Sequence, residues 1–239
     1  MQKNEILVFI PTYNERENVE KLYQEIKKYN QAVDILFCDD NSPDGTGEIL
    51  DNLAQKDTSV HVIHRSAKLG LGTAHVKAFE FAQQYKYRHL ITMDADFTHH
   101  PSYISAMLQK KDEADIVIGS RYAHGGSMSG WGSIRLPFTY FWRNMIKKGL
   151  GMHYDCTGAF RLYNVSQLKP ELYQKFSSKG FSFCMESLYR MHQSGFKIME
   201  VPIKAHNRMH GKSKLSVQIM KEVALTYFRL LFERKPRKK

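Results

Sequence analysis

Short apolar runs of strand length alternate with helical patterns along the first half of the chain. The first run, residues 6–10, is apolar at every position and ends at Pro11. An uninterrupted apolar strand is typical of a sheet that is covered on both faces. Between the runs, residues such as Val19, Leu22 and Ile26 recur at helical spacing. The alternation predicts an α/β fold in which helices flank a mostly parallel central sheet. The expected strands are residues 6–10, 33–38, 60–63, 89–93 and 115–119, and the first expected helix is residues 15–29.

Polar clusters follow four of these expected strands, namely residues 11–15, 39–46, 94–96 and 119–121. In open α/β sheets, ligands bind beyond the carboxyl ends of the strands. We therefore expect the four clusters to gather on one rim of the sheet and to form a single binding site.

Asp94 and Asp96 are separated by one residue at the end of the fourth expected strand. Side chains at alternate positions of extended backbone point to the same side. Two buried carboxylates would repel each other and be costly to desolvate. A divalent cation shared with a diphosphate removes both problems, and oxygen ligands favour Mg²⁺ or Mn²⁺. Because the motif is so short, a pair of exposed turn aspartates is the open alternative.

The other clusters contain residue types that suit a nucleotide. Tyr13 could stack on a base and Glu15 could accept hydrogen bonds from it, although a polar turn with Asn14 as helix cap would explain the same residues. Asp40 could accept from a base or ribose hydroxyl, or could belong to a solvated turn. Arg121 could direct its guanidinium at a phosphate, or could form a surface salt bridge.

A basic segment near the C-terminus, residues 208–214, contains Arg208 and Lys214. It could close over phosphate oxygens or could be a solvated loop. The formal net charge of +11 favours an anionic partner, such as nucleic acid, a phosphorylated substrate or an acidic membrane surface. Carboxylates on the predicted rim would repel nucleic-acid phosphates. A basic nucleic-acid-binding protein is therefore the less favoured, non-enzyme alternative.

Six segments occur in a characteristic order. They are residues 11–15 (PTYNE), 39–46 (DDNSPDGT), 69–74 (LGLGTA), 93–101 (MDADFTHHP), 119–122 (GSRY) and 157–161 (TGAFR). In these segments the chain closely resembles the dolichyl-phosphate (polyprenyl-phosphate) mannose synthases of glycosyltransferase family 2. The resemblance implies a GT-A domain over residues 1–215, followed by an amphipathic helix and basic tail over residues 216–239. It also implies a GDP-mannose donor, a dolichyl or polyprenyl phosphate acceptor, and inversion at the sugar carbon.

The resemblance assigns roles to individual positions. Asp94, Asp96 and Arg121 would be catalytic, and the two aspartates would hold Mg²⁺ or Mn²⁺. Cys38 would contribute to the nucleotide pocket through backbone and packing. Thr98 stands where relatives carry Ser or Gln, so metal ligation by Thr98 is not expected. The residues implied in nucleotide-sugar binding are Pro11, Tyr13, Glu15, Cys38, Asp40, Asp94, Ala95, Asp96, Arg121, Arg208 and Lys214.

Two segments suit a membrane surface. Residues 136–142 are rich in aromatics and are flanked by basic residues, and residues 217–232 predict a second amphipathic helix. Packing of both helices on the core or on a partner is the alternative. Residues 215–232 contain Lys221, Glu222 and Arg229, which argues against a membrane span.

The expected location is the cytoplasmic face of a membrane. The N-terminus lacks the pattern of a signal peptide, and the three cysteines lack disulfide or zinc spacing. A membrane-anchoring protein is a candidate partner. Transfer of glucose or another sugar from a nucleotide sugar to undecaprenyl phosphate is the closest functional alternative.

Overall fold

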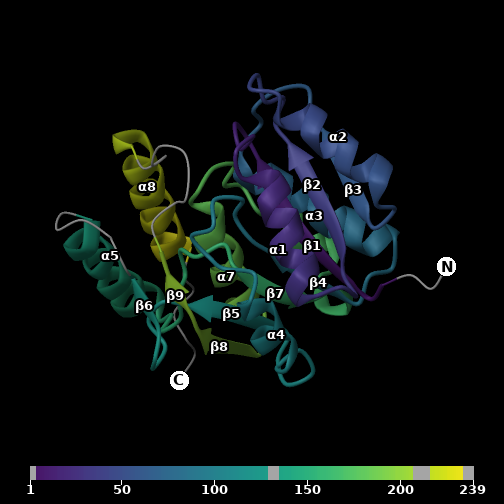
Figure 1. Ribbon diagram of the computed structural model, residues 1–239. Coiled ribbons are helices and arrows are strands. Elements are labelled where there is room, and N and C mark those ends of the chain that lie inside the picture. The colour runs from purple at the N-terminus through teal and green to yellow at the C-terminus, as the bar shows by residue number, and fades with distance from the viewer. Residues whose placement is uncertain (1–3, 129–134, 207–215, 234–239) are drawn as a thin grey trace.

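The computed structural model describes residues 4–128, 135–206 and 216–233. Its centre is a seven-stranded sheet in the order β3-β2-β1-β4-β7-β5-β8 (Figure 1). All neighbouring strands are parallel except at β7, which runs antiparallel to both β4 and β5. The predicted mostly parallel α/β sheet is therefore confirmed. The strands are β1 (Ile6–Thr12), β2 (Asp34–Asp39), β3 (Val60–His64), β4 (His89–Thr92), β5 (Ile116–Ser120), β7 (Arg161–Asn164) and β8 (Ile198–Pro202).

Helices cover both faces of the sheet. Successive residues of β1 enter two separate cores, with Leu7 and Phe9 in one and Val8 and Ile10 in the other. This division explains why the strand is apolar at every position. The helices are α1 (Val19–Tyr29), α2 (Thr46–Lys56), α3 (Leu71–Gln84), α4 (Tyr103–Leu108), α5 (Arg135–Leu150), α6 (Pro170–Tyr173), α7 (Phe183–Gln193) and α8 (Val217–Glu233), with a 3₁₀ turn at Val165–Gln167.

β7 is not among the strands expected from the sequence. Its first residue, Arg161, is fully buried, which is unusual for a charged side chain in a sheet. The guanidinium donates to the carbonyl oxygens of Cys156 at 3.0 Å and Cys184 at 2.8 Å, and to the Ser187 hydroxyl at 3.3 Å. Cys156 lies in the loop just before β7 and the other two acceptors belong to α7, and together they offset the cost of burying the charge.

The first helix begins later than expected. α1 starts at Val19, and the N-cap position is Asn18, so the suggestion that Asn14 caps it is wrong. Asn14 instead has a positive φ of 56° in the turn after β1. This turn keeps Glu15 outside the helix and brings it to the rim of the sheet.

α5 and α8 lie side by side at one end of the molecule (Figure 1). The Tyr227 hydroxyl donates to the carbonyl oxygen of Met145 at 3.1 Å, and the rings of Trp142 and Tyr227 are 5.8 Å apart. A further pair of short strands, β6 (Ser127–Met128) and β9 (Lys204–Ala205), lies near α5. Within the described residues, every helix is too short or too polar to cross a bilayer.

Candidate functional site

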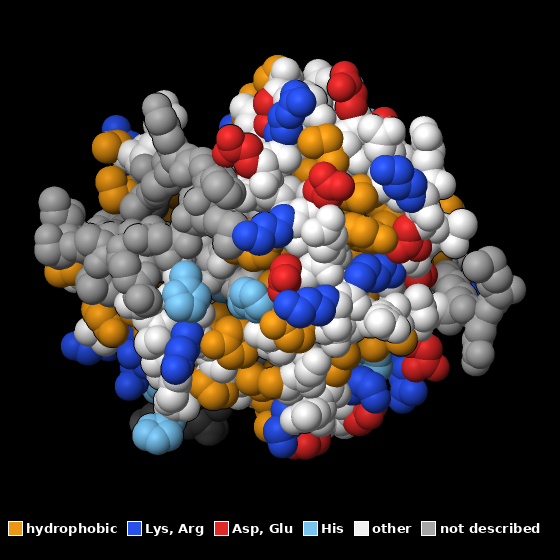
Figure 2. Space-filling model, viewed as in Figure 1, with side chains coloured by type: hydrophobic (Ala, Val, Ile, Leu, Met, Phe, Trp, Pro, Cys, Tyr) orange, Lys and Arg blue, Asp and Glu red, His pale blue; other side chains and the backbone are white. Residues whose placement is uncertain are grey.

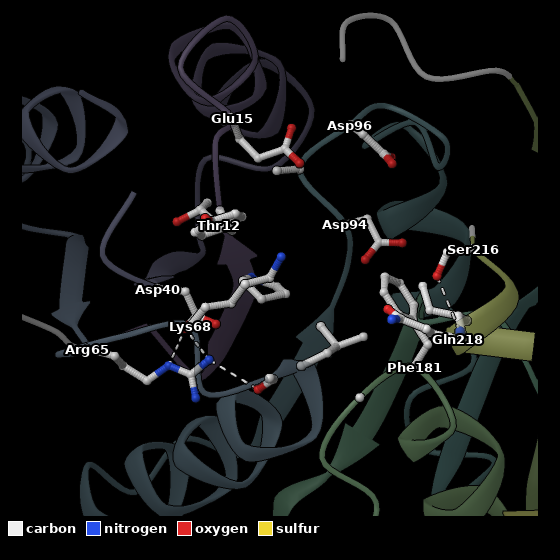
Figure 3. Close-up of a pocket in the computed structure, with 17 residues that line it drawn as sticks. Thr12, Glu15, Asp40, Arg65, Lys68, Asp94, Asp96, Phe181, Ser216 and Gln218 are labelled. Atoms are coloured by element: carbon white, nitrogen blue, oxygen red, sulfur yellow. Dashed lines mark hydrogen bonds and ion pairs between the residues drawn. The ribbon is translucent and has the colours of Figure 1, made fainter. Parts of the chain in front are cut away.

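A cavity of about 360 Å³ opens at the carboxyl ends of β1, β2 and β4 (Figure 3). This volume lies within the range of sites for small molecules and cofactors. Seven of the residues predicted to bind the nucleotide sugar line it. They are Pro11, Tyr13, Glu15, Asp40, Asp94, Ala95 and Asp96. The expectation that polar clusters gather on one rim is confirmed for residues 11–15, 39–46 and 94–96, whereas no residue of the fourth cluster, 119–121, lines the cavity.

One end of the cavity, which we call the nucleotide end, consists of Tyr13, Asp40, Arg65 and Lys68. Arg65 forms an ion pair with Asp40 and also donates to the Thr73 hydroxyl at 2.6 Å. Both charged side chains are less than 10% exposed. The Lys68 ammonium lies 4.1 Å from the centre of the Tyr13 ring. This end therefore offers an aromatic face, a fixed carboxylate and a cation.

Arg65 and Lys68 are not among the site residues expected from the sequence. They follow β3, and the rule that ligands meet the carboxyl ends of strands applies to β3 as well. If this rule had been applied to β3, it would have predicted that Arg65 and Lys68 contact a ligand. Of the two neighbouring acids at the end of β2, Asp40 lines the cavity. Asp39 is 2% exposed and accepts the backbone N–H of Ser42 at 2.9 Å.

The Asp94-Ala95-Asp96 turn follows β4 and lies in the middle of the cavity (Figure 3). Asp96 is only 2% exposed and accepts the backbone N–H of Thr98 at 2.9 Å. The alternative of two exposed turn aspartates is therefore wrong, although the pair does lie in a turn. The bond from Thr98 holds the Asp96 carboxylate in one orientation.

Arg121 follows β5 but lies outside the residues that line the cavity. Its guanidinium donates to Asp155 at 2.7 and 2.6 Å and to the Thr157 hydroxyl at 2.7 Å. Arg121 is 8% exposed, so the alternative of a surface salt bridge is also wrong. Burial by itself would raise the pKa of Asp155, but the positive charge of Arg121 outweighs burial and lowers it. Binding of a phosphate by Arg121 stays a prediction.

His99 lies close to this ion pair. Burial and the charge of Arg121 lower the pKa of His99 to about 4, so its imidazole is neutral at pH 7. The ring stacks on Phe160 with centroids 5.5 Å apart.

Cys38 is fully buried in the core and does not line the cavity. Burial raises the pKa of its thiol to about 11. This placement agrees with a contribution through packing. Arg208 and Lys214 lie outside the described residues, so their predicted phosphate contacts stay predictions.

The opposite end of the cavity comes from a distant part of the chain. We call its five residues the far wall: Gly180, Phe181, Ser216, Gln218 and Ile219. The first two precede α7, Ser216 directly precedes α8, and Gln218 and Ile219 belong to the first turn of α8. The far wall was not predicted from the sequence, because no strand of the expected sheet leads into it.

Comparisons with known proteins place the chain in a family. The model of the family described as glycosyl transferase family 2 matches residues 7–169. A polyprenol monophosphomannose synthase of Mycolicibacterium smegmatis is 39% identical over 223 residues, which cover 90% of this chain and 83% of the relative. An undecaprenyl-phosphate mannosyltransferase of Micrococcus luteus is 36% identical over 225 residues, which cover 94% of this chain and 93% of the relative.

Solved structures share the fold at much lower identity. Glucosyl-3-phosphoglycerate synthase from Mycobacterium tuberculosis superposes with a TM-score of 0.67 and 16% identity, over 98% of this chain and 81% of the other. A mannosyltransferase from Pyrobaculum calidifontis, in complex with GDP-Man and Mn²⁺, gives a TM-score of 0.62 and 11% identity, over 99% and 66%. The fold is thus the GT-A fold expected from the sequence. The family model matches most of this chain, and two relatives are more than 30% identical to it. The chain therefore belongs to glycosyl transferase family 2.

Proposed function

We propose that this protein transfers mannose from GDP-mannose to a dolichyl or other polyprenyl phosphate and inverts the sugar carbon. The observation that carries the proposal is the single cavity lined by seven of the predicted donor-binding residues. The names of the two relatives support mannose as the sugar and a polyprenyl phosphate as the acceptor. Family membership favours an enzyme over the nucleic-acid-binding alternative.

The nucleotide of the donor would bind at the nucleotide end. Tyr13 offers a ring on which a base can stack, with Lys68 displaced from its face. Asp40 and Glu15 can accept hydrogen bonds from N–H groups of guanine or from ribose hydroxyls. Asp40 needs no reorganisation to do so, because Arg65 already holds its carboxylate in place.

Asp94 and Asp96 fit a Mg²⁺ or Mn²⁺ ion, because both present carboxylate oxygens to the cavity. Among the described residues, no third His, Cys, Asp or Glu joins them in a cluster. Oxygens of the donor diphosphate would therefore supply part of the coordination. When bound, the cation supplies positive charge that stabilises the departing nucleotide diphosphate.

The acceptor phosphate requires little activation. Its second pKa is about 6, so it is largely ionised at neutral pH and can attack without a general base. The protein then has to position the acceptor opposite the leaving group and stabilise charge. Attack from that face would convert an α-linked donor into a β-linked product. Arg121, Arg208 and Lys214 are the residues predicted to bind phosphate groups.

The proposal is tested by changing Asp96→Asn and measuring transfer with GDP-mannose, Mg²⁺ and polyprenyl phosphate. We expect a loss of about 100-fold, the scale typical of removing one preorganised charge-stabilising group. The matched control is Asp112→Asn, because the Asp112 side chain is 61% exposed and does not line the cavity. Near-normal turnover by Asp96→Asn would refute the metal assignment. Mass spectrometry of the lipid product after supplying several nucleotide sugars identifies the donor.

A surface formed by α5 and α8 supports contact with a membrane. Large hydrophobic side chains project from it, with exposed fractions of 56% at Phe141, 72% at Leu225 and 85% at Phe232. Lys147 and Lys148 are exposed on α5. Figure 2 shows hydrophobic side chains and Lys or Arg side chains together along this side. Apolar groups beside basic groups suit an anionic lipid surface. Docking on the cytoplasmic face and a membrane-anchoring partner stay predictions.

Flotation with liposomes tests the docking surface. We expect Phe232→Ser combined with Leu225→Ser to release the protein from anionic vesicles, because both side chains are largely exposed. Leu69→Ser is the control, since Leu69 is 49% exposed on the loop before α3. Equal flotation of the double variant and the wild-type protein would refute docking through α8.

A further inference from the structure

Asp94 lies between the nucleotide end of the cavity and the far wall (Figure 3). A nucleotide sugar is a linear ligand in which the diphosphate joins the nucleoside to the sugar. When the nucleoside occupies the nucleotide end and the diphosphate lies at Asp94 and Asp96, the sugar reaches the far wall. This placement of the sugar rests on the proposed function, which sets the direction in which the donor lies in the cavity.

The chemistry of the far wall suits a sugar ring. Phe181 is 40% exposed, lines the cavity and carries an aromatic ring (Figure 3). Gln218 is exposed and carries an amide that both donates and accepts hydrogen bonds. Sugar hydroxyls also donate and accept, and the C–H groups of a pyranose form an apolar face that can lie against an aromatic ring. The far wall thus offers polar groups and an apolar surface together, as specific ligand sites do.

α8 restrains the position of Phe181 through contacts with the residues on either side of it in the sequence. Glu222 of α8 accepts hydrogen bonds from the backbone N–H of Ser182, at 3.1 Å, and from its hydroxyl. Gly180 also lies close to Glu222, since a Cβ built at position 180 would lie 2.3 Å from the Glu222 carboxylate. Phe181 therefore lies between two residues in contact with the same side chain. Glu222 and Gln218 occupy positions four apart on α8, so one helix sets both parts of the far wall.

α3 and α7 also form hydrogen bonds with the loop that carries Phe181. The carbonyl oxygen of Lys179 accepts the backbone N–H of Gly72 at 2.7 Å. The Glu186 carboxylate accepts the backbone N–H of Ser178 at 2.7 Å and pairs with Arg229 of α8 at 3.0 Å. Because three helices restrain the loop, the far wall is preorganised for a ligand rather than assembled around it.

We infer that Gln218 and Phe181 form the binding site for the sugar ring of the donor. Gln218 selects the sugar through hydrogen bonds to its hydroxyls, and Phe181 supports the ring by packing. Neither residue touches the nucleoside. The same helix that carries Gln218 also carries Leu225 and Phe232 of the proposed membrane surface, so the site lies where a lipid-borne acceptor can reach the sugar.

Calorimetric titration of Gln218→Ala with GDP and with GDP-mannose, each in the presence of Mg²⁺ and without acceptor, tests the inference. We expect the affinity for GDP to stay within about twofold, and that for GDP-mannose to fall about tenfold, as expected for one or two lost hydrogen bonds. Gln193→Ala is the matched control, because Gln193 is exposed at the end of α7 and does not line the cavity. Phe181→Leu should weaken GDP-mannose binding and leave GDP binding unchanged.

An equal loss of affinity for GDP and GDP-mannose would show that the substitution disturbs the whole cavity, and would overturn the inference. Unchanged affinities for both ligands would also overturn it. The proposed function fails in a different way. If the wild-type protein transfers another sugar and not mannose, the donor assignment is wrong, and the same comparison of that donor with its nucleotide decides the role of Gln218.

Discussion

Replacing Glu186→Gln should destabilise the protein by about 3 kcal/mol at pH 7. The carboxylate is fully buried and accepts hydrogen bonds from Ser178 at 2.7 Å and Arg190 at 2.9 Å, with Arg229 3.0 Å away. Burial would raise the pKa of this carboxyl, but these partners outweigh burial and lower the pKa from 4.5 to about 2. A difference of between two and three pKa units corresponds to about 3 kcal/mol of stability.

The sign of the pH dependence follows from the depressed pKa. The contribution of Glu186 is fully present above its usual pKa of 4.5 and is lost as the pH falls toward 2. The difference between wild-type and Glu186→Gln proteins should therefore be constant from pH 7 to about 5 and shrink below that. Urea unfolding at several pH values gives the free energy of unfolding of the two proteins. The comparison yields both the size of the difference at pH 7 and its decrease at low pH.

Glu113→Gln is the matched control. Glu113 pairs with Lys110 at 3.0 Å, but its side chain is 51% exposed. Such a pair contributes about 0–1 kcal/mol, so the control should change stability little. A destabilisation of less than about 1 kcal/mol by Glu186→Gln at pH 7 would refute the reasoning. A difference in stability between the wild-type and Glu186→Gln proteins that stays constant down to pH 3 would also refute it.

Further expectations concern packing, the buried ion pair and the metal. Gly72→Ala should destabilise the protein by about 1–3 kcal/mol, because the added Cβ would lie 2.2 Å from the carbonyl oxygen of Ser178. Gly47→Ala should be nearly neutral, since its Cβ meets no atom closer than 3.4 Å, and thermal unfolding compares the two. Asp155→Asn should cost about 3–5 kcal/mol in urea unfolding, because it leaves Arg121 buried without its charge partner; a cost below 1 kcal/mol would contradict this. Removal of divalent cations with EDTA should abolish transfer, and Mg²⁺ or Mn²⁺ should restore it. The unfolding temperature without donor should stay unchanged, because the two carboxylates alone make an incomplete site.

Part of the site was predictable from local pattern. The apolar run of β1 and the polar clusters after β1, β2 and β4 indicated both a covered parallel sheet and the rim at which ligands bind. These inferences succeed because side-chain alternation in strands and the direction of parallel strands are local properties of the chain. The family resemblance added roles for Asp94 and Asp96 that spacing alone left open.

The amino-acid sequence by itself therefore determined five of the seven strands, the covered faces of the sheet and the half of the cavity that follows directly from strand ends. Tertiary structure decided the other half. The far wall joins Phe181 to Gln218 of α8, the Asp40 carboxylate is held by Arg65, and the buried Arg161 guanidinium donates to the carbonyl oxygen of Cys184. The physical reason is that such contacts depend on which distant segments the folded chain brings together. The energies of hydrogen bonds and buried charges then depend on those neighbours, and no local periodicity records them.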